Sequence, residues 1–396
     1  MAIAMGQPRV VYARDYATGE AIAITVESGR IVSRTSTPQG PECWVAPSFF
    51  DVQINGCLGI DFGSPHLTVD QIRQVAETCR AHGIGRFCPT IITGSFEAIR
   101  HGFATLAAAC NSDPLLAWQM PGFHLEGPYL SAEDGPRGAH PREQIRDPDW
   151  DEFSRWQEAA GGRIRMVTVA PERKGALEFI KRLTTAGIVA AIGHTAATPE
   201  QIRAAIAAGA RTSTHLGNGC HAMLPRHPNY LWEQLAADEL WASIIPDGHH
   251  LPAAVVKSIA RGKTLARLLI TCDASSLAGM PPGIYSHWGS QLEVVPGGKV
   301  VVSGTPYLAG SGVFTDTCVS ILMQQAGLTL AEAIDAAAVR PRELLGLPVP
   351  TLTVGSPAEL IVFDWKPGEE IQIRDWIGGP AEPAGAVESG AGGWLK

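Results

Sequence analysis

The sequence predicts an α/β fold, a (β/α)₈ barrel of the TIM type, with a small β-sandwich domain built from both chain ends. Eight short apolar runs between residues 49 and 275 each have the length of a buried strand, and helical periodicity follows most of them. Apolar strands that alternate with helices are typical of a parallel sheet covered on both faces. Eight such units in about this length favour a closed barrel. An open doubly wound sheet is the alternative.

The predicted strands follow one another along the central part of the chain. They are FFDVQIN (49–55), IGRFCPTII (84–92), PGFHLEGP (121–128), RMVTVAP (165–171), GIVAAIGH (187–194), ARTSTHL (210–216), WASIIPDG (241–248) and LLITCDAS (268–275). Apolar residues at helical spacing predict helices over 68–82, 95–110, 174–186, 199–208 and 252–261. A long Gly/Pro-rich loop follows the third strand.

Both chain ends carry short strand patterns of their own. Residues 10–31 read as short strands with a turn at Gly29, and residues 352–365 read as a turn followed by an apolar strand. Neither stretch is long enough to form a core alone. We therefore expect one β-sandwich domain from residues 1–46 and 347–396, and a barrel domain from residues 47–346. The Gly/Pro/Ala-rich residues 378–393 are expected to be a loosely held tail.

Composition excludes several classes of partner. The 396 residues carry a net charge of −8, and no run of Lys or Arg offers a nucleic-acid surface. No apolar stretch is long enough to span a membrane, and the first ten residues do not resemble a secretory signal. The eight cysteines are scattered without a CxxC pair, which favours free thiols in a reducing cytoplasm. We expect a cytoplasmic protein without nucleic-acid or membrane partners.

Four predicted strands end in a side chain that can bind a metal or carry a proton. These are Glu126, His194, His215 and Asp273. Barrel enzymes place functional side chains at the carboxyl ends of their strands, so all four should meet at one rim. A single His at a strand end is more often a hydrogen-bonded structural residue. Four such groups at one rim would be costly to desolvate without a role.

The types of these residues indicate hydrolysis with a divalent ion. One carboxylate and two imidazoles are a common protein set for Zn²⁺ or Fe²⁺ in hydrolases. Asp273, across the mouth, would act as general base and then as acid to the leaving nitrogen. Nucleophilic serine chemistry is disfavoured because no GxSxG motif is present. No GxGxxG or GxxxxGK[ST] follows a strand, so nothing indicates a dinucleotide or nucleoside triphosphate.

At these residues the sequence resembles the N-acetylglucosamine-6-phosphate deacetylase family of the amidohydrolase superfamily. The resemblance runs over about residues 47–364 through FHLEGPYL, RGAHP, IGHTAAT, STHLGN, PDGHH, TCDASSLAG and VGSPAELIVFD. It implies that Glu126, His194 and His215 bind the metal and that Asp273 is the acid/base. It also implies that His140 approaches the scissile amide, where we interpret it as a partner for the oxyanion. A solvent-exposed loop histidine is the alternative.

The resemblance further implies a substrate-binding set formed by Asn218, Gly219, Arg226 and His250. The family holds a sugar phosphate with backbone near the first two, with the counterpart of His250, and with an Arg from a second subunit. Arg226 lies at about the right distance for that role, which would require a homodimer. The sequence LGNGCH departs from the family here, because Gly219 and Cys220 replace Ala and Met. The alternative is that Arg226 is a surface residue without a ligand.

Gln53 and Asn55 lie on one face of the first strand, where many amidohydrolases bind a second metal with two histidines. Neutral amides are poor zinc ligands beside imidazole, so one divalent ion per chain is expected, zinc with iron as the alternative.

Three functions are therefore open. The first is hydrolysis of N-acetylglucosamine 6-phosphate to glucosamine 6-phosphate and acetate. The second is the same chemistry on another N-acyl or cyclic amide without a phosphate. The third is a barrel kept for binding alone, against which all four strand-end residues count.

Overall fold

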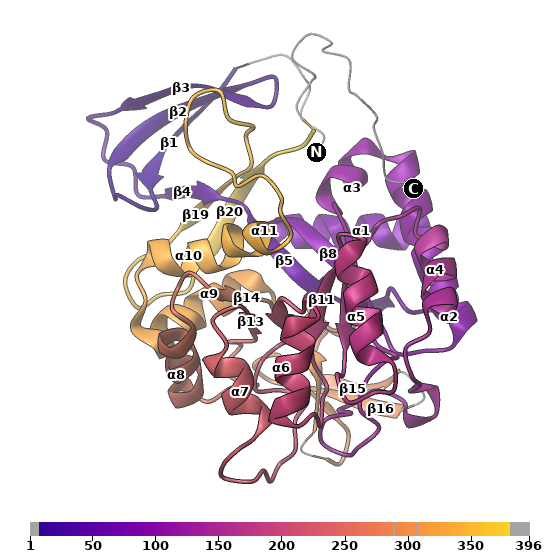
Figure 1. The fold of residues 1–396 in the computed structure, drawn as a ribbon. Coiled ribbons are helices and arrows are strands. Elements are labelled where there is room, and N and C mark those ends of the chain that lie inside the picture. The colour runs from indigo at the N-terminus through magenta and orange to yellow at the C-terminus, as the bar shows by residue number, and fades with distance from the viewer. Residues whose placement is uncertain (1–7, 288–289, 306, 381–396) are drawn as a thin grey trace.

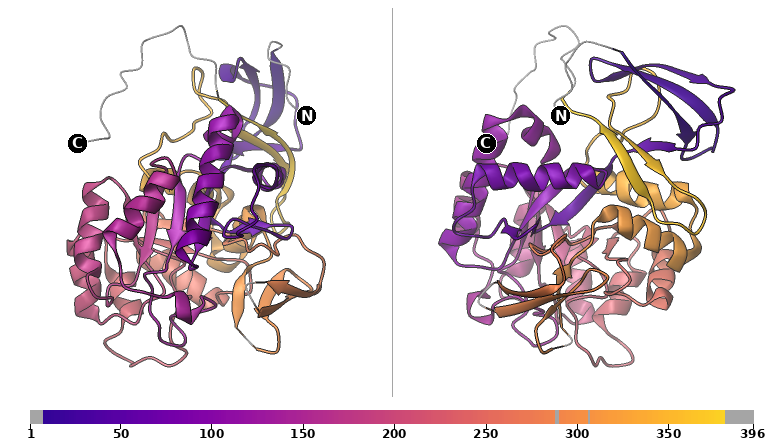
Figure 2. Two further views of the ribbon diagram at one scale, coloured as in Figure 1. Left: turned by 90° about the vertical axis from the view of Figure 1, so that its right-hand side faces the viewer. Right: turned by 180° about the vertical axis from the view of Figure 1, so that it is seen from behind.

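A computed structural model describes residues 8–287, 290–305 and 307–380, and its centre is an eight-stranded parallel sheet. The sheet order is β14-β13-β12-β11-β10-β9-β8-β5, which is the order of the strands along the chain read backwards. Helices surround this sheet in the ribbon views (Figures 1 and 2). The predicted barrel is confirmed. The strands are β5 (Phe49–Ile54), β8 (Ile84–Ile92), β9 (Phe123–Glu126), β10 (Ile164–Val169), β11 (Val189–Ile192), β12 (Thr212–Ser213), β13 (Trp241–Ile244) and β14 (Leu268–Ile270).

The helices begin where the sequence places their capping residues. Thr68, Thr198 and Thr329 each accept from a backbone N–H three residues on, and the Gln or Glu at that third position completes a capping box. The helices are α1 (Val69–Ala81), α2 (Phe96–Ser112), α3 (Pro114–Gln119), α4 (Trp150–Ala159), α5 (Ala176–Thr185), α6 (Pro199–Ala207), α7 (Tyr230–Ala236), α8 (Ala253–Lys263), α9 (Thr315–Leu322), α10 (Leu330–Ala338) and α11 (Arg340–Leu344). The five predicted helices correspond to α1, α2, α5, α6 and α8.

The interior of the barrel is apolar at one end and polar at the other. Side chains from six barrel strands pack against Leu344 and Leu345 at the end of the last helix, including Phe50, Met166 and Trp241. At the opposite, carboxyl end the interior holds buried polar groups. There His124 Nε2 lies 2.8 Å from Thr168 Oγ1, which lies 2.8 Å from Thr214 Oγ1. The apolar end stabilises the barrel, and the polar end supports the strand-end residues above it.

Both chain ends join in one six-stranded sheet, as the sequence predicted for the small β domain. Its order is β20-β19-β4-β1-β2-β3, and in Figure 1 it lies beside the barrel, with Ala46, Ile361 and Phe363 packed into the main apolar core. Ser28 and Gly29 both have positive φ, the geometry of a tight two-residue hairpin turn. The exact domain limits stay a prediction, and the predicted tail (378–393) lies almost wholly outside the described residues. The strands are β1 (Arg9–Asp15), β2 (Ala21–Glu27), β3 (Arg30–Ser36), β4 (Trp44–Pro47), β19 (Leu360–Asp364) and β20 (Gln372–Ile377).

A four-stranded antiparallel sheet between β14 and α9 was not predicted. Its strands are β15 (Gly283–His287), β16 (Ser290–Val295), β17 (Lys299–Val302) and β18 (Leu308–Ser311), and we call it the insert. It has a small apolar cluster of its own, with Leu292, Val294 and Val300. A short hairpin of β6 (Gly56–Cys57) and β7 (Ile60–Asp61), a 3₁₀ turn (Arg142–Gln144) and a π-helical turn (Met323–Gly327) complete the described elements.

The seam between β5 and β14 closes the barrel through few backbone bonds. An isolated bridge joins Ile54 to Ala274, and Asn55 N donates to Ala274 O at 2.9 Å. The buried carboxylate of Asp51 adds further hydrogen bonds across this seam. It accepts from Gln53 N, Cys272 N and the hydroxyls of Thr271 and Thr315. Burial raises the pKa of Asp51, and these four donors oppose that rise. One carboxylate thus ties β5, β14 and α9 together.

The structure bears on two sequence predictions, one about the cysteines and one about membrane-spanning helices. All eight cysteines are unpaired, and six of them are buried. Within the described residues, no helix has both the length and the apolar character needed to cross a bilayer.

The Asp51 seam gives a stability prediction. In Asp51→Asn, the side-chain amide N–H groups would face donors that now bond to a carboxylate oxygen. The free energy of unfolding should therefore fall by about 3 kcal/mol. Chemical denaturation measures this. Asp70→Asn is the control, since Asp70 is exposed on α1 and pairs only with neighbouring Arg73. Equal stability of both variants would show that the seam does not depend on Asp51.

Candidate active site

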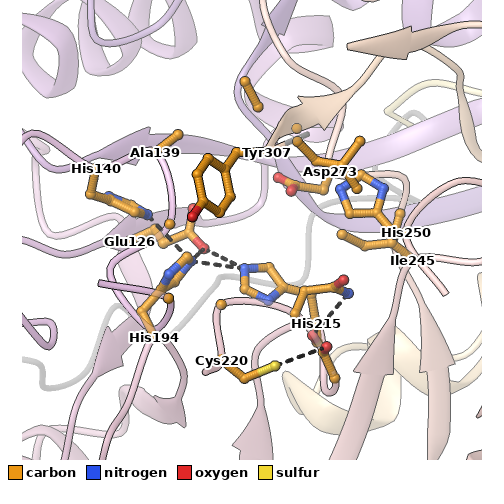
Figure 3. Close-up of a pocket in the computed structure, with 18 of the residues that line it drawn as sticks. Glu126, Ala139, His140, His194, His215, Cys220, Ile245, His250, Asp273 and Tyr307 are labelled. Atoms are coloured by element: carbon orange, nitrogen blue, oxygen red, sulfur yellow. Dashed lines mark hydrogen bonds and ion pairs between the residues drawn. The ribbon is translucent and has the colours of Figure 1, made fainter. Parts of the chain in front are cut away.

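A cleft of about 430 Å³ opens at the carboxyl end of the barrel strands. All four predicted strand-end residues line it, and so do four of the five other predicted site residues. Figure 3 shows His140, His194 and His215 grouped around Glu126. Asp273 and His250 lie together on the other side of the cleft. The predicted residues brought together are Glu126, His140, His194, His215, Asn218, Gly219, His250 and Asp273.

Glu126, His194 and His215 form a compact triangle of ligand atoms. Glu126 Oε1 lies 3.0 Å from His215 Nε2 and 3.4 Å from His194 Nε2, and the two Nε2 atoms are 3.1 Å apart. Ligands about 2.0–2.1 Å from a tetrahedral ion are roughly 3.3 Å from one another. The three observed separations therefore suit a single ion shared by these residues.

The hydrogen bonding of His194 supports the same assignment. Its Nδ1 lies 2.8 Å from Pro136 O, and because a carbonyl only accepts, Nδ1 carries the proton. With Nδ1 as the donor, Nε2 is the nitrogen that faces Glu126 and His215 and would bind an ion. A carboxylate and a lone pair at this range repel unless a cation lies between them. A carbonyl that fixes the tautomer of a ligand histidine is also usual around protein-bound metals.

The backbone is strained at three of these strand ends. His194, His215 and Asp273 have φ of 49°, 31° and 50°, a region that side chains with a Cβ rarely adopt. Such strain persists when surrounding structure enforces it, and it is concentrated at functional sites. Gly219, with φ of 55°, also has a positional requirement. A Cβ there would lie 2.7 Å from His194 Nδ1, so only glycine lets this loop pack against the ring.

His140 lies beside the triangle rather than in solvent. Its Nε2 is 3.3 Å from His194 Nε2, and its Nδ1 is 2.9 Å from Thr93 Oγ1. Burial lowers its pKa to about 3, so the ring is neutral. Glu126, His140 and His194 also have ligand atoms within 4.8 Å of one another. The triangle with His215 is the more compact of the two groups, because His215 makes short contacts to both other members.

Asp273 is held by the two amides that the sequence placed at the second-metal position. Gln53 Nε2 and Asn55 Nδ2 donate to Asp273 Oδ1 at 2.9 and 2.7 Å. Both amides thus face Asp273 as donors, which is unlike a metal ligand. Among the described residues no donor engages Oδ2, which leaves that oxygen for the cleft. Burial raises the pKa of Asp273 to about 7, and the charge of Glu126 acts in the same direction.

His250 is fixed by a buried acid. Its Nδ1 lies 2.7 Å from Asp247 Oδ2, which also accepts from Ser311 Oγ. Burial opposes ionisation of Asp247, yet the bonds to His250 prevail and its pKa falls to about 2. The carboxylate is therefore ionised and fixes the orientation of the His250 ring, which lines the cleft.

Arg226 is the predicted site residue that the single chain leaves outside. It is exposed on the loop between α6 and α7, and it does not line the cleft. No lysine or arginine lines the cleft in the described part of the chain.

Sequence analysis missed several residues that shape the site. Thr93 orients His140, the carbonyl of Pro136 orients His194, and Asp247 orients His250. Tyr307, from the unpredicted insert, lines the cleft with its side chain 64% exposed and stands near Glu126 in Figure 3. No sequence motif marks these contacts, since each joins segments that only the fold brings together.

Comparisons with known proteins agree with this geometry. Residues 44–384 match the Amidohydrolase family. The chain is 35% identical to N-acetylglucosamine-6-phosphate deacetylase of Bos taurus over 81% of this chain and 80% of that protein. It is 31% identical to N-acetylgalactosamine-6-phosphate deacetylase of Escherichia coli over 85% and 86%, respectively.

A solved structure shows the same likeness in three dimensions. It is an N-acetyl-D-glucosamine-6-phosphate deacetylase variant from Mycobacterium smegmatis in complex with N-acetyl-D-glucosamine-6-phosphate. The TM-score is 0.83 at 30% identity, covering 94% of this chain and all of that one.

The ligand triangle predicts metal content. The purified protein should carry about one divalent ion per chain, and His194→Ala and His215→Ala should each lose it, because two ligands rarely retain zinc. Elemental analysis after exhaustive dialysis measures this. His249→Ala is the control, since His249 bonds to Gly297 O away from the cleft. Two tightly held ions per chain would refute a single site.

Proposed function

The chain belongs to the amidohydrolase family, in the branch of the N-acetylglucosamine-6-phosphate deacetylases, and from that membership we propose that it deacetylates an amino-sugar 6-phosphate. Water and N-acetylglucosamine 6-phosphate would give glucosamine 6-phosphate and acetate. The observation that carries this proposal is the site itself: a ligand triangle, a buried acid/base and a neutral imidazole around one cleft. This set is what hydrolysis of an unactivated amide requires.

Glu126, His194 and His215 would hold one divalent ion, zinc with iron as the alternative. Bound there, the ion would supply Lewis-acid chemistry, which polarises an amide carbonyl and lowers the pKa of water. Both metals suit two imidazoles and a carboxylate.

The chain's own residues would move the proton and hold the developing charge. Asp273 Oδ2 faces the cleft and would accept a proton from the attacking water, then deliver it to the leaving nitrogen. Gln53 and Asn55 would fix the other oxygen and so the direction of transfer. If the Thr93 hydroxyl donates to His140 Nδ1, His140 Nε2 carries the proton and can donate to the carbonyl oxygen.

The sugar phosphate would lie in the cleft against Asn218, Gly219 and His250. Asp247 holds the His250 ring in place through Nδ1, which would leave Nε2 to contact the phosphate. We propose that Arg226 of a second copy completes this end, which requires a homodimer. The unpaired cysteines support a cytoplasmic location for this enzyme.

A second candidate is the same hydrolysis of an N-acyl substrate without phosphate. One observation favours it: within the described residues, the cleft of a single chain has no arginine or lysine. Acetate release from N-acetylglucosamine, with and without the 6-phosphate, separates the two candidates. N-acetylgalactosamine 6-phosphate belongs in the same assay, because the relatives include deacetylases for both sugars.

The role of Asp273 predicts both a rate and a pH profile. Asp273→Asn should keep the ion and the fold but lower kcat by at least about 100-fold, because the amide cannot accept the proton. Since burial raises the pKa of Asp273 to about 7, kcat/KM of the native enzyme should fall as pH drops below this region. A bound cation favours the carboxylate, which moves the midpoint lower. Near-native turnover of Asp273→Asn would mean that another group is the base.

The trans role of Arg226 predicts a change in substrate affinity. Arg226→Ala should raise KM for the 6-phosphate about tenfold or more, with a smaller effect on kcat, since the phosphate lies away from the amide. The KM for unphosphorylated N-acetylglucosamine should not change, which is the internal control. Equal kcat/KM for the two sugars, together with a silent Arg226→Ala, would contradict phosphate recognition.

A further inference from the structure

Two loops of the cleft wall touch each other through their backbones. One lies between β9 and α4 (residues 127–149), and we call it the β9 loop. The other precedes α7 (residues 216–229) and carries three of the predicted substrate residues, so we call it the substrate loop. A Cβ at Gly135 of the β9 loop would lie 3.0 Å from both Cys220 O and His221 Cα of the substrate loop. The two loops are therefore packed as one wall.

The ring of His194 contacts both loops. Pro136 O of the β9 loop lies 2.8 Å from its Nδ1. Gly138 and Gly219, one from each loop, approach the ring so closely that a Cβ would lie 3.2 Å from Cε1 and 2.7 Å from Nδ1, respectively. The position of this predicted metal ligand therefore depends on how the two loops pack together.

His221 joins the loops through side-chain hydrogen bonds. Its Nε2 lies 3.1 Å from Glu133 Oε2 of the β9 loop, and because a carboxylate only accepts, Nε2 carries the proton. The Tyr230 hydroxyl accepts from His221 N at 2.8 Å and lies 3.0 Å from Nδ1, to which it can donate its own proton. Tyr230 is buried at the start of α7, and burial raises its pKa to about 12, so the hydroxyl keeps that proton. His221 thus connects α7 to the β9 loop.

Few other contacts hold the outer part of the substrate loop. Among the described residues, the hydrogen bonds that residues 221–228 form are those of His221 and one from Asn229 Nδ2 to Pro225 O. Leu224 is the member of this segment that packs against the main apolar core. Without the bonds of His221, the segment would keep one hydrogen bond and one apolar contact.

We propose that His221 is a positioning residue of the active site. Its bonds to Tyr230 and Glu133 hold the substrate loop on the β9 loop, and so fix both the contacts to the sugar phosphate and the ligand His194. The part about the sugar phosphate rests on the proposed deacetylation, and the part about His194 does not. His221 ends LGNGCH, the segment in which the sequence departs from the family.

Hydroxyl and carboxylate substitutions test this bridge. Tyr230→Phe removes the hydroxyl and leaves the buried ring in place. Glu133→Ala removes the acceptor of His221 Nε2, whereas Glu133→Gln keeps an acceptor there and should preserve native behaviour. Tyr16→Phe is the matched control, because the Tyr16 hydroxyl bonds to Asp335 Oδ1 at 3.0 Å and neither residue lines the cleft.

The first readout is the rate at which the zinc-loaded protein releases its ion to an excess of a chelating dye, which requires no substrate. Tyr230→Phe and Glu133→Ala should each release zinc about threefold to tenfold faster, the scale of one net hydrogen bond. Glu133→Gln and Tyr16→Phe should stay within about twofold of the native protein.

The second readout is the kinetics of acetate release from N-acetylglucosamine 6-phosphate with zinc in excess. Tyr230→Phe should raise KM by about threefold to tenfold and change kcat by less than about twofold, because the substrate loop binds the sugar phosphate and does not carry Asp273. A general loss of stability would not give this split, and Tyr16→Phe, which loses a comparable hydrogen bond, should leave both constants unchanged.

Unchanged zinc release and KM in Tyr230→Phe would overturn the proposal, and so would equal changes in Tyr16→Phe. If Tyr230→Phe does not fold, Glu133→Ala and Glu133→Gln decide, because the Glu133 side chain is 66% exposed and its replacement leaves the core intact. Equal behaviour of these two variants would then contradict the bridge. If no amino-sugar phosphate is cleaved, the proposed function fails, and zinc release still tests the role of His221.

Discussion

Closure of the barrel between β5 and β14 is the constraint on which the whole site depends. Parallel strands present their carboxyl ends at one edge of any sheet, but the ends of β5 and β14 meet only if the sheet closes, and this pair shares few backbone bonds. The carboxylate of Asp51 compensates by accepting four hydrogen bonds from both strands and α9. It lies two residues before Gln53, and it binds the backbone N–H of Cys272, the residue before Asp273. The same contact that closes the barrel therefore helps to position Asp273 at the cleft.

The backbone strain and the buried polar groups of the site cost free energy, and apolar packing elsewhere in the molecule offsets this cost. Three functional residues have left-handed backbone, and a carboxylate, three imidazoles and Asp273 are buried together. Each of these features destabilises an isolated segment. A continuous apolar core between the barrel and its helices, and the apolar plug at the opposite end, provide the stabilisation that holds them. Binding of a cation would relieve the repulsion among the ligands.

The loops and the insert determine which molecules can reach this chemistry. The loop after β9 contributes Pro136 to orient His194 and His140 to line the cleft, while Ala139 of the same loop packs on the insert. Tyr307, at the start of β18, forms part of the cleft wall. The cleft wall in this chain thus includes segments outside the barrel, which agrees with the general division between a rigid scaffold and variable loops.

The sequence by itself determined the eight barrel strands, five of the helices, the joining of the two chain ends and the four strand-end residues, because local periodicity and strand termini record these features directly. Only the tertiary structure decided that Gln53 and Asn55 serve Asp273, that Thr93 and Asp247 orient two histidines, and that Arg226 lies outside its own cleft. It also revealed the insert, whose short strands carry weak patterns. These contacts join residues far apart in the chain, and no local pattern records a distance that only folding sets.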